Sequence, residues 1–307
     1  MNQESLIRKA VGQFSVVKQL FGIEKFLEIA RSDPSSPIIY YLSKSLPDLS
    51  QIKELLDQLK KDPEHIGVLV KLDFLLRPYH ILRHLDNCLS KNKDEKKLNI
   101  ILDHISNSKS FWQGYCEAEV ASNLKDVFGT IELEPELPNG KVADIKFLLN
   151  SEDVFAEITV PKKGYRYRNA EEKALKSGKA VRMPDVVERA SDKILAELEH
   201  FSNILDQVQS IIIINLNESD FEDLDIQDSL MGISKLVLIT DRSTGRTNAK
   251  VAREDWTAFK MDNELARVGA IICYKRDFHL NGTVVYNKKI FVMCFEKEEY
   301  EKLLNLF

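Results

Sequence analysis

The sequence has few cysteines, and they fit neither a zinc knuckle nor a disulfide framework. The four are Cys88, Cys116, Cys273 and Cys294, which lie far apart and include no CxxC pair. Zinc knuckles and disulfide-rich secreted domains both need closely spaced cysteines. This cysteine usage therefore favours a protein of a reducing compartment.

Long apolar runs are also missing. The longest, SIIIINL at 210–216, has the length of a strand and falls well short of the roughly 20 residues that a membrane span needs. The first residues, MNQESLIRKAVGQF, carry a glutamate and an amphipathic pattern where a signal peptide has an uninterrupted apolar stretch. We expect a cytoplasmic protein without membrane contact.

Positive charge is not spread along the chain. The formal net charge is −5 and 30% of residues are charged, which excludes a nucleic-acid coat protein that is basic throughout. Any contact with nucleic acid must then come from a local basic patch. The 307 residues, 44% of them hydrophobic, are enough for one large core or two modest ones, and usual domain sizes favour two.

Signatures of several common enzyme classes are missing as well. No Ser-His-Asp or Cys-His arrangement can be defended. His80 and His84 lie one turn apart in YHILRH, but the glutamate of a zincin helix and a nearby third ligand are lacking. The polar stretch DRSTGRTNAK at 241–250 has too few glycines for a P-loop. We expect neither a zinc site nor a P-loop.

The hydrophobic pattern changes near residue 108. Residues 1–108 repeat apolar side chains at three- and four-residue spacings, which predicts an all-α helical domain. Residues 109–307 predict an α/β domain with a mixed central sheet. We expect a helix near 110–128, three short strands before 161 and a helix from about 184 to 206, then further strands, including GTVVYN (282–287) and KIFVMCF (289–295), and a closing helix. The predicted fold class is α+β, with a boundary at 108/109.

Two carboxylates stand on neighbouring predicted strands in KVADIKFLLNSEDVFAEITVPKKG, residues 141–164. Asp144 comes early in the first strand and Glu157 late in the second. If the strands pair antiparallel through the NSED turn, the two side chains lie side by side at one end of the sheet. Adjacent carboxylates in an apolar setting need a cation between them, and Mg²⁺ or Mn²⁺ is the natural choice. The alternative is a pair of solvent-facing strand carboxylates.

The segments CEAEVASNLKDVF, GKVADI and FAEITVPKK resemble, in order and in residue type, the core of the PD-(D/E)xK nuclease superfamily, the restriction-endonuclease-like fold. The resemblance covers roughly residues 112–216. It implies an αβββαβ core and a metal-dependent nuclease that hydrolyses phosphodiester bonds in DNA or RNA with Mg²⁺ or Mn²⁺. It also implies a glutamate on the first helix, an aspartate on the second strand and a Glu-x-Lys on the third.

Carried onto this sequence, the resemblance makes Glu117, Asp144 and Glu157 the metal ligands. Glu119 is an alternative for the helical glutamate, and we prefer Glu117. Thr159 stands where the family has its catalytic lysine, and a threonine hydroxyl cannot balance charge at the scissile phosphate.

Another lysine would have to replace the one missing at Thr159. Lys162 and Lys163 follow the third strand directly, and Lys146 shares the predicted strand face of Asp144. Of these we name Lys162 as the catalytic candidate.

A basic segment follows the third strand. PKKGYRYRNAEEKALKSGKAVR, residues 161–182, interleaves tyrosines with arginines, a mixture suited to phosphate contacts and base stacking; an ordinary solvated loop is the alternative. The residues expected to bind nucleic acid here and on the following helix are Lys162, Lys163, Arg166, Arg168, Arg189 and Lys193.

The leading hypothesis is therefore a nuclease, with DNA favoured over RNA as partner. One alternative is a catalytically inactive nuclease-fold module that binds nucleic acid or a protein partner. Another is that the helical half is the working part, as a partner-binding bundle. A homodimer is an assembly that the sequence leaves open.

Overall fold

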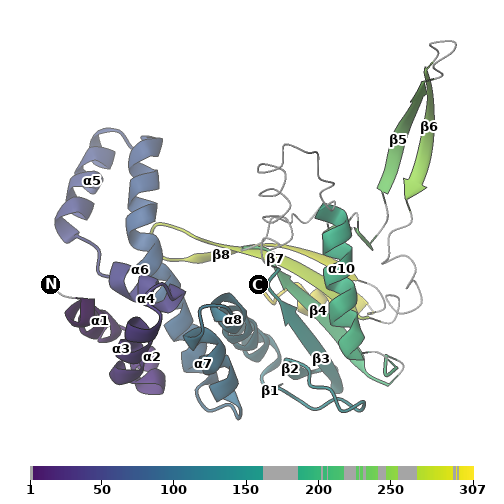
Figure 1. Ribbon diagram of the computed structural model, residues 1–307, viewed down its shortest axis with the longest axis horizontal. Helices are drawn as coiled ribbons and strands as arrows, with labels where there is room; N and C mark the ends of the chain where they lie inside the picture. Colours follow the sequence, from purple (N-terminus) through teal and green to yellow (C-terminus); the bar gives the residue numbers. More distant parts are fainter. Residues whose placement is uncertain are drawn as a thin grey trace.

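The structure is a computed structural model, and it places a set of helices beside a mixed sheet (Figure 1). It describes residues 3–161, 186–201, 203–205, 207–217, 226–227, 229–230, 233–240, 247–254, 268–292, 295 and 297–307. Among these, no helix combines the length and apolarity that a bilayer crossing would need.

The N-terminal region is helical, as its periodicity predicted. Its helices are α1 (Gln3–Val11), α2 (Ser15–Phe21), α3 (Ile23–Ser32), α4 (Pro37–Lys44), α5 (Leu49–Lys61), α6 (Ile66–Asn92) and α7 (Leu98–Ser106). The sequence breaks act locally. Gly22 separates α2 from α3 with a φ of 73°, a conformation that suits glycine. Asp48 caps α5, because its side chain accepts hydrogen bonds from the backbone N–H groups of Ser50 and Gln51.

The C-terminal region contains a six-stranded sheet with the order β1-β2-β3-β4-β7-β8. Strand β3 pairs in parallel with β4, and β4 in parallel with β7, while the outer pairs are antiparallel. The strands are β1 (Ile131–Leu133), β2 (Ile145–Leu149), β3 (Glu152–Thr159), β4 (Gln209–Asn215), β7 (Ala270–Phe278) and β8 (Val284–Val292). Strands β5 (Ile233–Thr240) and β6 (Thr247–Glu254) form a separate antiparallel hairpin that extends away from this sheet (Figure 1).

Helices complete the α+β architecture. They are α8 (Phe111–Phe128), α10 (Val186–Leu198), the 3-10 helix η1 (Glu199–Phe201) and α13 (Lys297–Leu303). The order α8-β1-β2-β3-α10-β4 is αβββαβ, and the predicted α+β class with a mixed sheet is confirmed.

Two details of the prediction were wrong. The stretches GTVVYN and KIFVMCF were expected as separate strands, but one strand, β8, runs from Val284 to Val292, because Lys288, the residue between them, pairs with Tyr274 of β7. The helix expected to reach about residue 206 ends at Leu198 and tightens into η1.

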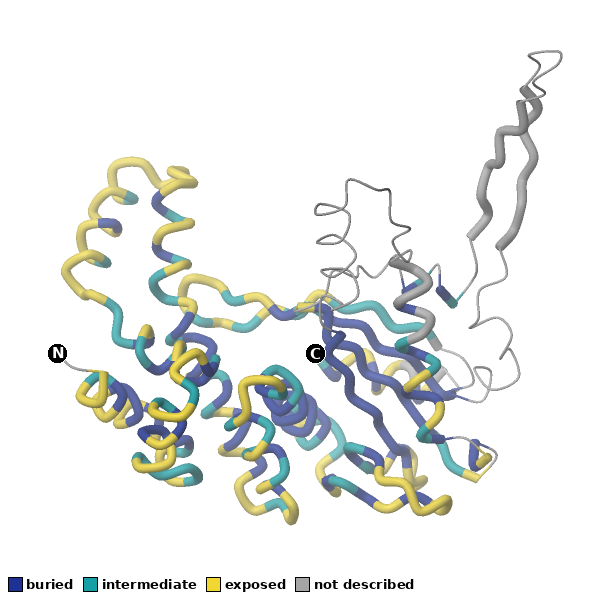
Figure 2. The backbone as a smooth tube through the Cα atoms, viewed as in Figure 1, coloured by how far each residue is buried: buried dark blue, intermediate teal, exposed yellow. Residues whose placement is uncertain are grey.

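The two faces of the sheet bury different cores. Ala156 and Ile158 of β3 belong to a core shared with α8, whereas Phe155 belongs to a second core with α10. Figure 2 shows the buried strands between these layers. The first core extends without interruption from Ile7 in α1 to Tyr274 in β7. Apolar packing therefore crosses residue 108, and the division into domains 1–108 and 109–307 stays a prediction.

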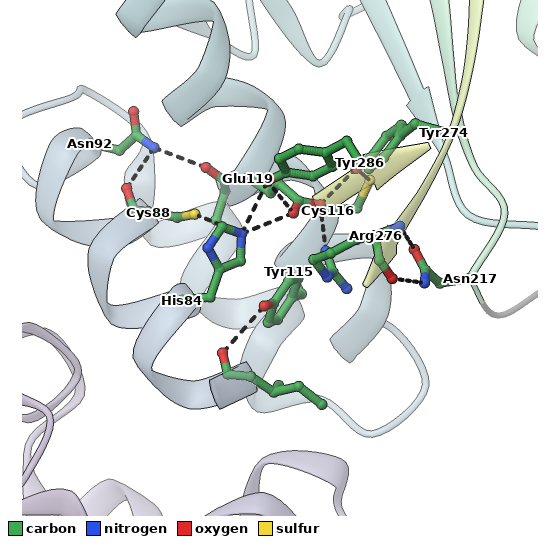
Figure 3. A network of polar contacts seen from close by, with 12 residues as sticks. His84, Cys88, Asn92, Tyr115, Cys116, Glu119, Asn217, Tyr274, Arg276 and Tyr286 are labelled. Atoms are coloured by element: carbon green, nitrogen blue, oxygen red, sulfur yellow. Dashed lines mark hydrogen bonds and ion pairs between the residues drawn. The ribbon is translucent and has the colours of Figure 1, made fainter. Parts of the chain in front are cut away.

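A buried polar network links the helices to the sheet (Figure 3). The Glu119 carboxylate of α8 is fully buried and forms an ion pair with Arg276 of β7. Its oxygens also accept hydrogen bonds from Tyr274 (2.8 Å) and Tyr286 (2.9 Å), and His84 Nε2 of α6 lies 2.9 Å away. Four elements, α6, α8, β7 and β8, are thus joined at one carboxylate.

Charge on Glu119 stabilises the fold. Burial raises the pKa of this carboxyl, but the Arg276 guanidinium and His84 outweigh burial and lower the pKa to about 2. Arg276 in turn lies over the Tyr115 ring, with 4.2 Å from its Cζ atom to the ring centroid. The ion pair is consequently compensated on both sides, as a buried pair must be.

We predict that Arg276→Met destabilises the protein by about 3–5 kcal/mol, the usual cost of leaving a buried charge without its partner. Urea denaturation at neutral pH measures this free energy of unfolding. Arg8→Met serves as the control, because Arg8 and Glu24 form an exposed ion pair, for which a loss of at most about 1 kcal/mol is expected. Equal losses in the two variants would show that the Glu119 network does not hold the fold.

His84 gives the network a pH dependence. Burial lowers its pKa, but Cys88 and Glu119 outweigh burial and raise it from 6.5 to about 9. A cation with a raised folded pKa contributes its full stabilisation below pH 6.5 and loses it as the pH rises through 9. We therefore expect the stability difference between the parent and His84→Gln to shrink from pH 6.5 to 9.5 in parallel denaturation series. A constant difference over this range would show that His84 is uncharged in the folded state.

Candidate metal centre

Asp144 directly precedes β2, beside the end of β3. The antiparallel register pairs Ile145 with Ala156, so one step further along places Asp144 opposite Glu157. The Asp144 Oδ2 atom accepts a hydrogen bond from the Ile158 backbone N–H at 2.6 Å. The hairpin therefore has the alignment that the sequence predicted for the two carboxylates.

Glu157 lies on the α10 face of β3 and is buried. It shares this face with Phe155, because residues two apart on a strand point the same way. Its Oε1 atom lies 2.8 Å from His200 Nδ1. Burial raises the pKa of Glu157, and the neighbouring carboxylates of Asp144 and Glu197 raise it further.

Glu117 belongs to α8, on the other side of the sheet from α10. Its Oε2 atom accepts a hydrogen bond from His104 Nδ1 (2.8 Å), and its Oε1 atom accepts one from Gln113 Nε2 (2.9 Å). Gln113 also donates to the Ile158 backbone oxygen at 2.8 Å. Close approach of α7 to α8 makes this possible: a Cβ atom on Gly114 would lie 2.6 Å from the Cβ atom of His104.

Asp144 connects the two sides. Burial is the largest cause of the raised pKa of Asp144, and the nearby Glu117 carboxylate is the second. Asp144, in turn, raises the pKa of Glu157, so these two carboxyl groups lie close together. The structure thus brings Asp144 near both predicted ligands, with Glu117 on the α8 side and Glu157 on the α10 side.

Among the described residues, one set of three side chains offers metal-ligand atoms that all lie within 4.8 Å of one another. The set consists of Glu157, Glu197 and His200. Both glutamates are buried and His200 is half-buried. Two of the three were not predicted. Their signal was the spacing Lys193-Glu197-His200 on the helix after β3, which places successive side chains on one helical face.

Lys146 and Lys193, the described lysines considered as replacements at Thr159, contact different partners. Thr159 is buried at the end of β3. Lys146 points elsewhere, since its ammonium pairs with Glu132 (2.7 Å) and Asp153 (3.8 Å). Lys193 contacts one member of the three-residue set, with its Nζ atom 2.5 Å from Glu197 Oε1.

Most of the residues predicted to bind nucleic acid lie outside the described residues. This holds for Lys162, which is also the catalytic candidate, and for Lys163, Arg166 and Arg168. Arg189 is described only as part of helix α10.

Comparison with known proteins gives no relative: no family model, no curated protein and no solved structure matches this chain.

Proposed function

We propose that the protein is a metal-dependent phosphodiesterase whose ion is held by Asp144 and Glu157, with Glu117 beside them. The observation that carries this proposal is the repulsion between half-buried Asp144 and buried Glu157, which face each other where β2 begins and β3 ends. Both carboxyls have raised pKa values because burial and neighbouring carboxylates disfavour their charged forms. A divalent cation would relieve that repulsion.

Each side chain has a role in the proposed site. Asp144 and Glu157 supply oxygen ligands on adjacent strands. Glu117 adds negative charge from α8 and is held in place by His104 and Gln113. A hard divalent ion bound there supplies a nucleophilic water at neutral pH and neutralises charge on the phosphate. DNA or RNA is the proposed substrate, with DNA favoured.

Lys193 is the described lysine that we propose as the missing positive charge. Its ammonium is bound to Glu197, which borders Glu157, and its side chain is 38% exposed, so it is free to turn toward a phosphate. Lys162 stays a candidate from the sequence alone.

The second candidate function is a nuclease-fold module without catalysis that binds nucleic acid or a protein partner. Thr159 favours it, because this residue replaces the lysine that the nuclease resemblance requires, and its buried hydroxyl carries no charge.

We predict that Asp144→Asn lowers Mg²⁺- or Mn²⁺-dependent cleavage of DNA at least about 100-fold, the scale of losing one electrostatic stabiliser. The fold should persist, since the asparagine oxygen still accepts the Ile158 hydrogen bond and a repelling charge is removed. Cleavage of labelled single- and double-stranded DNA measures activity, and thermal denaturation measures folding.

The matched control is Asp153→Asn, on the same hairpin, because the Asp153 side chain is 53% exposed. Cleavage by Asp144→Asn at the parental rate would contradict the metal assignment. If the parent protein itself shows no metal-dependent cleavage, the result favours the binding module.

A second prediction concerns the basic segment. Changing Lys162, Lys163, Arg166 and Arg168 together to glutamine should weaken binding to duplex DNA. It should also flatten the dependence of log K on log salt by about 0.9 for each phosphate that the variant no longer neutralises. Fluorescence anisotropy at several salt concentrations, without divalent metal, measures both quantities.

A quadruple glutamine variant of exposed lysines in the helical N-terminal region, Lys53, Lys61, Lys71 and Lys93, removes the same charge elsewhere and should keep the parental slope. If the two quadruple variants shift the slope equally, the segment 161–182 contributes net charge only.

A further inference from the structure

The turn from α10 into η1 presents two potential ligands to Glu157. Glu197 lies in the last turn of α10, and His200 lies in η1. With Glu157 they bring a carboxylate oxygen, a second carboxylate oxygen and an imidazole nitrogen within 4.8 Å of one another. Small side-chain rotations would let three donors this close converge on one ion with bonds of about 2.0–2.2 Å.

We infer that Glu157, Glu197 and His200 form a second cation site, which takes a divalent transition ion such as Mn²⁺ or Zn²⁺ in preference to Mg²⁺. The inference rests on the proposed function, because Glu157 belongs to both sites.

The donor set decides the preference. Mg²⁺ selects oxygen ligands and keeps several waters, whereas imidazole nitrogen suits transition ions. The site proposed around Asp144 offers only carboxylate oxygens, but His200 adds a nitrogen on the α10 side. Because the two neighbouring sites differ in ligand chemistry, each should prefer a different metal ion.

The existing contacts agree with a cation at this place. His200 Nδ1 lies 2.8 Å from Glu157 Oε1, so its ring already faces the carboxylate. Lys193 places its ammonium 2.5 Å from Glu197 Oε1. A positive charge thus occupies one side of the cluster, and a metal ion would compete with it. Because Lys193 is partly exposed, its ammonium can move into water when the ion binds.

The second cation site therefore predicts opposite changes in metal affinity for the Lys193 variant and for the ligand variants, which a purely structural ion pair would not give. Removing His200 or Glu197 removes a ligand and should weaken metal binding. Removing the ammonium of Lys193 removes a competitor and should strengthen it.

The test measures Mn²⁺ binding to the full chain without nucleic acid, by calorimetry and by electron paramagnetic resonance. We expect two Mn²⁺ ions per chain, one of them with a nitrogen coupling in the pulsed spectrum. His200→Gln should abolish that coupling. His200→Gln and Glu197→Gln should each lower the affinity for one Mn²⁺ ion at least about tenfold. This is the smallest loss of affinity expected even when a residue that only supports a ligand is removed. Lys193→Gln should tighten the same ion.

Glu199→Gln is the matched control, since it removes one carboxylate from an exposed position in the same turn, and it should bind like the parent. The inference is overturned if His200→Gln and Glu197→Gln bind Mn²⁺ with the parental stoichiometry and affinity, or if the parent shows no nitrogen coupling.

Failure of the proposed function has a different signature. If Asp144→Asn and Glu117→Gln keep the nitrogen-coupled ion and the parent cleaves no nucleic acid, the second cation site stands and the phosphodiesterase proposal falls. If instead Asp144→Asn abolishes cleavage while His200→Gln leaves Mn²⁺ binding unchanged, the second cation site falls and the phosphodiesterase proposal stands.

Discussion

The burial of Glu119 beside Arg276 is the interaction on which the arrangement of this protein depends. A fully buried carboxylate needs its charge matched, and the matching groups come from α6, β7 and β8. Satisfying them fixes the rotation of α8 about its own axis. Residues two apart on a helix point to nearly opposite sides, about 160° apart, so with Glu119 directed at β7, Glu117 is directed at His104. The structural network thereby orients a residue of the candidate site.

This geometry explains what the sequence could and could not predict. The hairpin was predictable because strand alternation and a short turn determine which residues of β2 and β3 oppose each other, and Asp144 and Glu157 followed from that rule. The choice between Glu117 and Glu119 could not be derived from spacing alone, since both lie near the buried stripe of α8. It depended on Arg276, which is more than 150 residues away along the chain.

Glu197 and His200 were missed for a related reason. Their helix was predicted, and the spacing of Glu197 and His200 places them on one helical face, but this spacing does not show that the face meets Glu157 of β3. The continuous core from α1 to β7 was hidden in the same way. Periodicity shows where helices and strands occur, whereas the packing of α6 on α8 and of α8 on the sheet is decided by contacts between segments distant in sequence.

Glu119 differs in its electrostatics from Asp144 and Glu157. The pKa of Glu119 is lowered, so its charge stabilises the folded state above the unfolded pKa, and this stability is lost only in acid. The pKa values of Asp144 and Glu157 are raised, so their ionisation works against folding increasingly as the pH rises above the unfolded values. A fold that matches one buried carboxylate with arginine, histidine and two tyrosines could match others in the same way. Glu157 has His200 beside it and Asp144 accepts the Ile158 hydrogen bond, yet the two carboxylates still face each other at the ends of β2 and β3. This repulsion is the reason for proposing a cation as their partner.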